Sequence, residues 1–127
     1  SFKSELLGGL HDLDTDSLKL ALIKASPSGT YGAATTNYSD VTGNSDEASG
    51  TNYTAGGQAL DSATISLDGT TAIVDFADEV FANVTTSTDG CIIYNTANSN
   101  SAIAVIAGDL TIQFPAADAS NAVIRIA

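Results

Sequence analysis

Hydrophobic positions follow two different periods along this chain, and the change between them separates a short first segment from the rest. Within the first ten residues the apolar side chains recur at helical spacing, at Phe2, Leu6, Leu7 and Leu10. Ser1 can cap the start of this segment, and Gly8-Gly9 can stop it because glycine accepts the left-handed conformation. The pattern predicts a short amphipathic helix in residues 1–10, too short to be stable unless it packs on something else.

From residue 17 onward the period is two. Leu18, Leu20 and Leu22 alternate with Lys19, Ala21 and Ile23, which predicts a strand with one buried and one partly covered face. Pro27 and Gly29 end this strand, because proline donates no ladder hydrogen bond. Residues 30–57 are then polar, rich in Gly, Ser, Thr and Asn, and interrupted by Tyr31, Tyr38 and Tyr53. We expect a long loop there that is either functional or pinned by its tyrosines.

The second half alternates short apolar runs with turn residues. Strands are predicted at residues 63–67, 71–76, 80–86, 91–94, 103–106, 110–114 and 123–126. Tight turns are predicted at Asp68-Gly69, which has the composition of a type I′ hairpin, and at Asp89-Gly90 and Gly108-Asp109, with longer loops at 95–101 and 115–121. This spacing predicts a mainly β fold: one antiparallel β-sandwich or barrel-like domain over residues 11–127, preceded by the short helix.

The charge balance excludes several classes of partner. Among the 127 residues there are 15 Asp and Glu against 4 Lys and Arg, so the net charge is −11. Nucleic acids and anionic lipid surfaces both require clustered cations, so we expect neither as a partner. No apolar run reaches the ~18 residues of a spanning helix, and we expect no membrane segment.

Candidate chemistry is sparse. His11 is the only histidine, and we expect it to be a surface residue after the double glycine. Cys91 is the only cysteine, and we expect it to be a buried, inert thiol. Asp12, Asp14 and Asp16 have the spacing that opens a calcium loop, but the glycine and glutamate that should follow are missing. In an extended segment the three carboxylates would share one side, so a weak calcium site stays open beside the simpler interpretation of a solvated turn.

No nucleotide-binding or catalytic motif is present, and the carboxylate pairs are those that an acidic chain contains by chance. We therefore expect no enzymatic activity, no cofactor and no metal, and favour a binding or structural module. The candidate partner contacts are the apolar and cationic residues of the first segment and two loop tyrosines: Phe2, Lys3, Leu6, Leu7, Tyr38 and Tyr53.

Four segments carry a resemblance to a known group of proteins: SFKSELLGGLHDLDTDSLKLALIKASPSGTYG, TNYTAGGQALDSATISLDGTTAIVDF, GCIIYNT and FPAADASNAVIRIA. In content and order they resemble small virion structural proteins of tailed bacteriophages, although at Ala107-Gly108-Asp109 the chain is shorter than the glycine-rich loop expected in relatives. The resemblance implies a non-enzymatic subunit of the phage particle, made in the host cytoplasm. Its expected partners are the major capsid protein or other virion subunits, with a homotrimer as one arrangement.

Within the virion, a capsid decoration or cement protein is favoured, with the first segment as its anchor. An acidic exterior keeps such a subunit soluble at high copy number. Two alternatives stay open: a tail or head-fibre component in host recognition, and a carbohydrate-binding β-sandwich module in which Tyr38 and Tyr53 stack on sugar.

Overall fold

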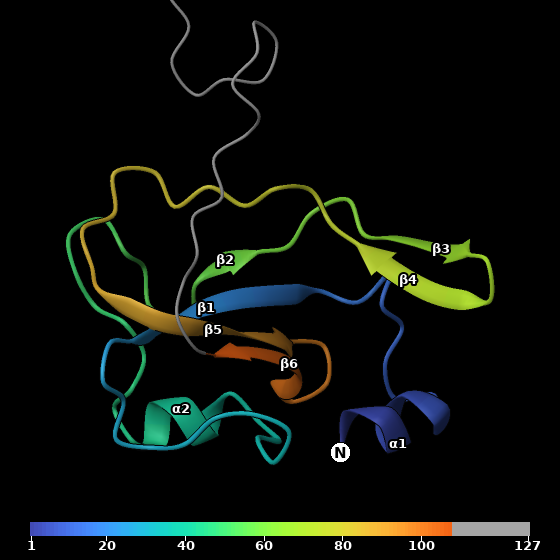
Figure 1. The fold of residues 1–127 in the computed structure, drawn as a ribbon, viewed down its shortest axis with the longest axis horizontal. Helices are drawn as coiled ribbons and strands as arrows, with labels where there is room; N and C mark the ends of the chain where they lie inside the picture. Colours follow the sequence, from blue (N-terminus) through green and yellow to red (C-terminus); the bar gives the residue numbers. More distant parts are fainter. Residues whose placement is uncertain (108–127) are drawn as a thin grey trace, which may run out of the picture.

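The computed structural model describes residues 1–107 of the chain (Figure 1). The elements follow in the order α1 (Phe2–Leu7), β1 (Leu18–Lys24), α2 (Ser39–Gly43), β2 (Gln58–Ala59), β3 (Thr64–Asp68), β4 (Thr71–Asp75), β5 (Thr88–Asn95) and β6 (Ser101–Ala107). The predicted turn Gly108-Asp109, the strands at 110–114 and 123–126 and the loop at 115–121 lie outside the described residues. Neither described helix is long and apolar enough to cross a membrane.

All strand pairing among these residues is antiparallel. One sheet has the order β2-β1-β5-β6, and a second, two-stranded sheet consists of β3 and β4. This confirms the predicted mainly β, antiparallel fold with a short N-terminal helix. Neither sheet closes into a barrel within residues 1–107.

The core lies on one face of the four-stranded sheet. Its fully covered side chains come from β1, β5, β6 and α2: Ala21, Ile23, Ile92, Tyr94, Ala102 and Val41. Figure 1 shows α2 and its flanking loop against this face, and the segment from β4 to β5 crossing the other side. From Lys19 onward the alternation predicted for β1 is confirmed: Ala21 and Ile23 are buried, whereas Leu20 and Leu22 are only partly covered. Leu18, at the start of the strand, is buried as well.

The polar stretch 30–57 is less irregular than predicted, because it contains α2. The amide N–H groups of Thr36 and Asn37 donate to the carboxylate of Asp40, and the Asn37 side-chain oxygen accepts from the N–H of Ser39. These hydrogen bonds order the chain at the start of the helix, whose Val41 is buried in the core. The helix was missed because five residues are too few to show a helical period.

The hairpin predicted at Asp68-Gly69 is confirmed, with a shift in the turn. Asp68 pairs with Thr71, so the two loop residues are Gly69 and Thr70. Gly69 has a φ of 60° and Thr70 does not have a positive φ. One left-handed residue at the first loop position is the arrangement of a type II′ turn, not of the predicted type I′.

Two predictions in the second half are wrong. Residues 80–86 form no strand, because Asn83 is left-handed (φ 56°) and only Thr85 makes a β-bridge, to Thr51. Asp89-Gly90 is no turn, because both residues lie inside β5. The pairing of Ile23 with Gly90 and of Lys24 with Thr88 leaves Asp89 as an extra residue in a bulge. Its carboxylate accepts a hydrogen bond from the N–H of Ser26 across the strands.

Candidate functional site

The β3–β4 hairpin carries an apolar face that the rest of the described chain leaves largely exposed. Because strand residues alternate between faces, one face holds Ile65 and Leu67 with their cross-strand partners Val74 and Ala72. Ile65 is 57% exposed and Leu67 is 73% exposed. Within residues 1–107 the two strands pack substantially only on each other, and Figure 1 shows the hairpin extending away from the larger sheet.

The opposite face of the hairpin has a different composition. It consists of polar and acidic side chains with a single apolar one: Thr64, Ser66, Asp68, Thr71, Asp75 and Ile73. An isolated two-stranded hairpin is at best marginally stable in water, and it usually needs a further strand or a packed face. The amphipathic hairpin therefore has the properties of a contact surface, with its apolar face toward the partner.

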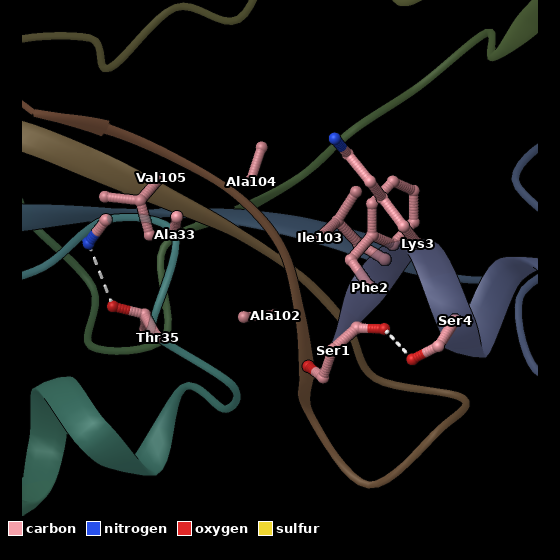
Figure 2. A pocket seen from close by; sticks show the side chains of 11 residues that line it. Ser1, Phe2, Lys3, Ser4, Ala33, Thr35, Ala102, Ile103, Ala104 and Val105 are labelled. Carbon is pink, nitrogen blue, oxygen red and sulfur yellow. Dashed lines mark hydrogen bonds between the residues drawn. The ribbon is translucent and has the colours of Figure 1, made fainter.

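The four contact residues predicted in the first segment divide between the start and the end of α1. Phe2 is half-buried, with its ring centroid 5.5 Å from that of His11, and together with Lys3 it lines a groove beside β6 (Figure 2). Leu6 is 39% exposed and Leu7 is 91% exposed, so both are available to another molecule. The structure thus does not bring the four residues into one patch.

His11 is not the surface residue that the sequence predicted. It is 6% exposed, and its ring nitrogens contact the carboxylate of Glu5 at 3.1 Å and the side-chain amide of Asn95 at 3.0 Å. The His11 hydrogen bond lowers the pKa of Glu5. The histidine thus ties α1 to the end of β5, and the double glycine gives the chain the reversal that turns the ring inward, with Gly9 at φ 75°.

The three aspartates at 12, 14 and 16 do not share one side, because their segment is a turn and not an extended strand. Asp16 turns toward the sheet, where its carboxylate accepts hydrogen bonds from the side-chain amides of Asn95 (2.6 Å) and Asn98 (3.1 Å). The neighbouring side chain of Asp12 raises the pKa of Asp14. Among residues 1–107, no group of three or more His, Cys, Asp or Glu side chains is placed to hold a metal ion.

Tyr38 and Tyr53 meet at the carboxylate of Glu47. Both hydroxyls donate to it, and the N–H of Gly56 does so as well. Burial, followed by the hydrogen bond and charge of Glu47, raises the pKa of Tyr38 far above its usual range. Burial also raises the pKa of Tyr53. The hydrogen bond that its hydroxyl accepts from the N–H of Leu22 opposes this increase, and the hydrogen bond and charge of Glu47 add to it.

The Tyr38 ring also stacks on the buried ring of Tyr94, with centroids 4.3 Å apart and planes 5° apart. The Tyr94 hydroxyl donates to the backbone oxygen of Gly56 at 2.7 Å. One ring face of Tyr38 and both loop hydroxyls are therefore occupied by the protein's own contacts. The two tyrosines pin the loop to the sheet, which was one of the two roles that the sequence left open.

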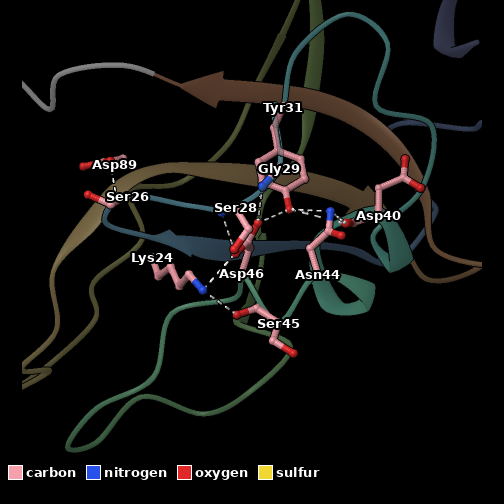
Figure 3. Close-up of polar contacts among 10 residues, drawn as sticks. All are labelled: Lys24, Ser26, Ser28, Gly29, Tyr31, Asp40, Asn44, Ser45, Asp46 and Asp89. Atoms are coloured by element: carbon pink, nitrogen blue, oxygen red, sulfur yellow. Dashed lines mark hydrogen bonds and ion pairs between the residues drawn. The ribbon is translucent and has the colours of Figure 1, made fainter.

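A second buried carboxylate, Asp46, organises the other end of this loop (Figure 3). It is fully buried, pairs with Lys24 at 2.9 Å, and accepts hydrogen bonds from the N–H groups of Ser28 and Gly29 and from the Tyr31 hydroxyl. Burial alone would raise the pKa of Asp46, but these donors hold it well below its usual range. Asp46 and Glu47 were one of the carboxylate pairs that the sequence analysis attributed to chance, so their role in ordering this loop was missed.

Cys91 is half-buried in β5, and burial raises the pKa of its thiol. A raised pKa leaves little thiolate at neutral pH, in keeping with the inert thiol predicted from the sequence.

The described part of the chain thus presents a contact surface on the hairpin, exposed leucines on α1 and a groove beside β6. No family model, no curated protein and no solved structure matches this chain.

Proposed function

We propose that this protein is a structural subunit of a bacteriophage virion, a decoration or cement protein that binds the assembled head shell. The observation that carries the proposal is the apolar face of the β3–β4 hairpin, where Ile65 and Leu67 are mostly exposed and on which no other described helix or strand packs substantially. The resemblance of the sequence to virion proteins supplies the assembly in which this face would be buried. The major capsid protein is the partner to which we assign the contact.

The size of this surface fits adhesion at many equivalent sites. A fully buried Leu or Ile side chain contributes ~1.5–3 kcal/mol, and Ile65 and Leu67 keep 57% and 73% of their surface exposed. Covering both contributes about 2–4 kcal/mol for each copy, before the cost of association is subtracted. A single contact of this kind is weak. A trimer would present three such faces at once and would gain affinity through multivalency.

The charge of the chain restricts the surface that it can bind. With a net charge of −11, the subunit is repelled by other acidic surfaces and by its own copies. We infer that the shell surface under the hairpin is neutral or basic. Raising the salt concentration should then weaken the electrostatic part of the binding and leave the apolar part.

The hairpin itself offers a matched test. Leu67→Ser removes an apolar side chain from the exposed face, and Ile73→Ser makes the same kind of change on the opposite face of the same hairpin. Binding to phage heads stripped of this protein is measured by co-sedimentation. We expect Leu67→Ser to bind at least ~10-fold more weakly, which corresponds to about 1.4 kcal/mol, and Ile73→Ser to bind as the unchanged protein does.

Equal binding by both variants would contradict the assignment of the apolar face. Failure of the unchanged protein to bind stripped heads would contradict the proposed function itself. Circular dichroism of each variant shows whether the fold is retained, so that a loss of binding is not mistaken for unfolding.

The exposed leucines of α1 provide a second contact to test. Leu7 is 91% exposed, so Leu7→Ser should leave the fold intact. If α1 anchors the subunit as the sequence suggests, the variant detaches from heads at lower salt than the unchanged protein. Unchanged retention on heads would restrict the contact to the hairpin.

A further inference from the structure

The chain contains two Asp-Gly pairs, and the fold places them in opposite surroundings. Asp68-Gly69 lies at the tip of the β3–β4 hairpin, where both residues are exposed. Asp89-Gly90 lies in the bulge of β5, between β1 and β6. In an Asp-Gly pair the glycine has no Cβ, so its backbone nitrogen can approach the carboxyl group of the preceding aspartate without hindrance. The two pairs therefore share one chemistry and differ only in what surrounds them.

The first pair is weakly restrained by the described part of the chain. Gly69 has a φ of 60°, and a Cβ added there would have no atom of these residues within 4 Å, so the space around its backbone is open. Its N–H has no backbone acceptor among residues 1–107. The hairpin packs substantially only on itself, and an isolated two-stranded hairpin is marginally stable, so its turn opens at low cost.

The second pair is held by hydrogen bonds. The Asp89 carboxylate accepts one from the N–H of Ser26 at 2.7 Å, and the N–H of Gly90 donates to the hydroxyl of Thr88 at 3.3 Å. Gly90 also has strand partners on both sides, in β1 and in β6. Attack by the Gly90 nitrogen on Asp89 therefore requires that these bonds break and that the larger sheet opens locally.

We propose that Asp68-Gly69 is a modification site, at which aspartate isomerises spontaneously to isoaspartate. The Gly69 nitrogen forms a bond to Cγ of the protonated Asp68 carboxyl, and the hydroxyl that leaves Cγ departs as water with the proton from the nitrogen. The product is a five-membered cyclic imide. Water then adds to one of its two carbonyl carbons and breaks the bond from that carbon to the nitrogen. Opening at Cγ restores aspartate, whereas opening at the backbone carbonyl gives isoaspartate, with no other reactant consumed.

The rearrangement changes the backbone of the hairpin and keeps its charge. In isoaspartate the main chain runs through Cβ and Cγ, so the backbone gains one carbon atom and the carboxylate moves to Cα. Asp68 pairs with Thr71 to close a two-residue turn, whose geometry leaves no place for an extra backbone atom. The strand pairing next to the turn, which aligns Leu67 with Ala72, is therefore weakened.

The modification would act on the same hairpin face to which the contact with a shell is assigned. Leu67, the most exposed apolar residue of that face, directly precedes the reacting aspartate. Loss of strand order at this end disturbs the face without removing any of its side chains. The site and its chemistry do not depend on the virion assignment, so either proposal can fail without the other.

The two Asp-Gly pairs of the chain are each other's control. Full-length protein is incubated in mildly acidic buffer in which circular dichroism shows the native fold, and a parallel sample is incubated unfolded in urea. Chymotrypsin then cleaves after Phe76 and Phe81 and places the two pairs in separate peptides. Isoaspartate in each peptide is quantified by chromatography and by electron-transfer fragmentation in the mass spectrometer, which distinguishes the two linkages.

In the folded protein we expect isoaspartate to form at least ~10-fold faster at Asp68 than at Asp89, a difference in activation free energy of about 1.4 kcal/mol. In urea the two rates should be similar, because the surroundings that distinguish the pairs are gone. Similar rates in the folded protein, or a faster reaction at Asp89, would overturn the proposal. A preference for Asp68 that persists undiminished in urea would also overturn it, because neighbouring residues and not the fold would then select the site.

A conservative variant tests the effect on the hairpin. Asp68→Glu keeps the negative charge, but its carboxyl would have to close a larger, six-membered ring, so we expect no imide at this position. After the same incubation, hydrogen exchange in β3 and β4 should be faster in the unchanged protein and should stay constant in the variant. Constant exchange in molecules that contain the isoaspartate would contradict the weakening of the strand pairing.

Discussion

The tyrosines of this protein should resist ionisation until the fold itself opens. All four, Tyr31, Tyr38, Tyr53 and Tyr94, have a pKa raised above the usual value near 10, with burial as the first cause. For Tyr38 and Tyr53 the carboxylate of Glu47 adds to the effect, because ionising either hydroxyl would replace a hydrogen bond by two adjacent negative charges.

The sign of the pH dependence follows from these shifts. In the unfolded chain a tyrosine loses its proton near pH 10, whereas in the folded protein it keeps it. The stabilisation is therefore complete below pH 10 and is lost as the pH rises above it. Above pH 10, each tyrosine that stays neutral in the fold lowers the free energy of unfolding by up to ~1.4 kcal/mol per pH unit. Tyr38 and Tyr53 together lower it by at most ~2.7 kcal/mol per pH unit, reduced by solvent screening of their exposed parts. Within about two pH units this is comparable with the stability of a small domain.

The assay is a paired alkaline titration. Absorbance at 295 nm reports tyrosinate and far-ultraviolet circular dichroism reports the fold. We expect both signals to change together, well above pH 10, in a single transition. In Glu47→Gln the extra negative charge is gone, so part of the tyrosinate signal should appear before the fold is lost. Asp78→Asn removes the same charge from an exposed acid outside the tyrosine network and should titrate as the unchanged protein does.

Tyrosinate forming with a midpoint near pH 10, while the circular dichroism stays native, would refute the reasoning. Identical titrations of Glu47→Gln and the unchanged protein would show that burial alone, without Glu47, sets the pKa of Tyr38 and Tyr53.

Three further changes test the packing. Gly57→Ala should destabilise the fold by about 3–5 kcal/mol, since its Cβ would lie 1.9 Å from the backbone oxygen of Leu20. Gly69 has a similar positive φ but open space around it, so Gly69→Ala should cost only about 1–2 kcal/mol. Urea unfolding compares the two variants. Ile92→Ala, in the fully buried centre of β5, should cost about 2–5 kcal/mol in the same assay, and a loss below ~1 kcal/mol would place Ile92 outside the core. Because the pKa of Asp46 is lower in the fold than its ordinary value of 3.8, its ionised carboxylate stabilises the fold above pH 3.8, and this stabilisation is lost as the pH falls toward the lower pKa. In Asp46→Asn the free energy of unfolding should therefore fall less steeply in acid. An unchanged dependence on acidic pH would contradict the buried network.

Local sequence patterns were reliable where neighbouring residues decide the structure. The helical spacing from Phe2 to Leu7 and the two-residue alternation of β1 each depend on contacts along one element, and both predictions hold. The β3–β4 hairpin was equally visible, since Asp68-Gly69 lies between two alternating runs. The same local logic failed at Asp89-Gly90, because a bulge and a turn favour the same residues and only the pairing with β1 distinguishes them.

The candidate site was only partly visible in the sequence. The sequence by itself determined the acidic charge, the mainly β class and the apolar residues of the first segment and the hairpin. Only the tertiary structure decided that His11 is buried between Glu5 and Asn95, that Tyr38 and Tyr53 converge on Glu47, and that one face of the hairpin stays largely exposed. These contacts join residues up to 84 positions apart, and burial depends on which elements pack together, which no spacing along the chain encodes.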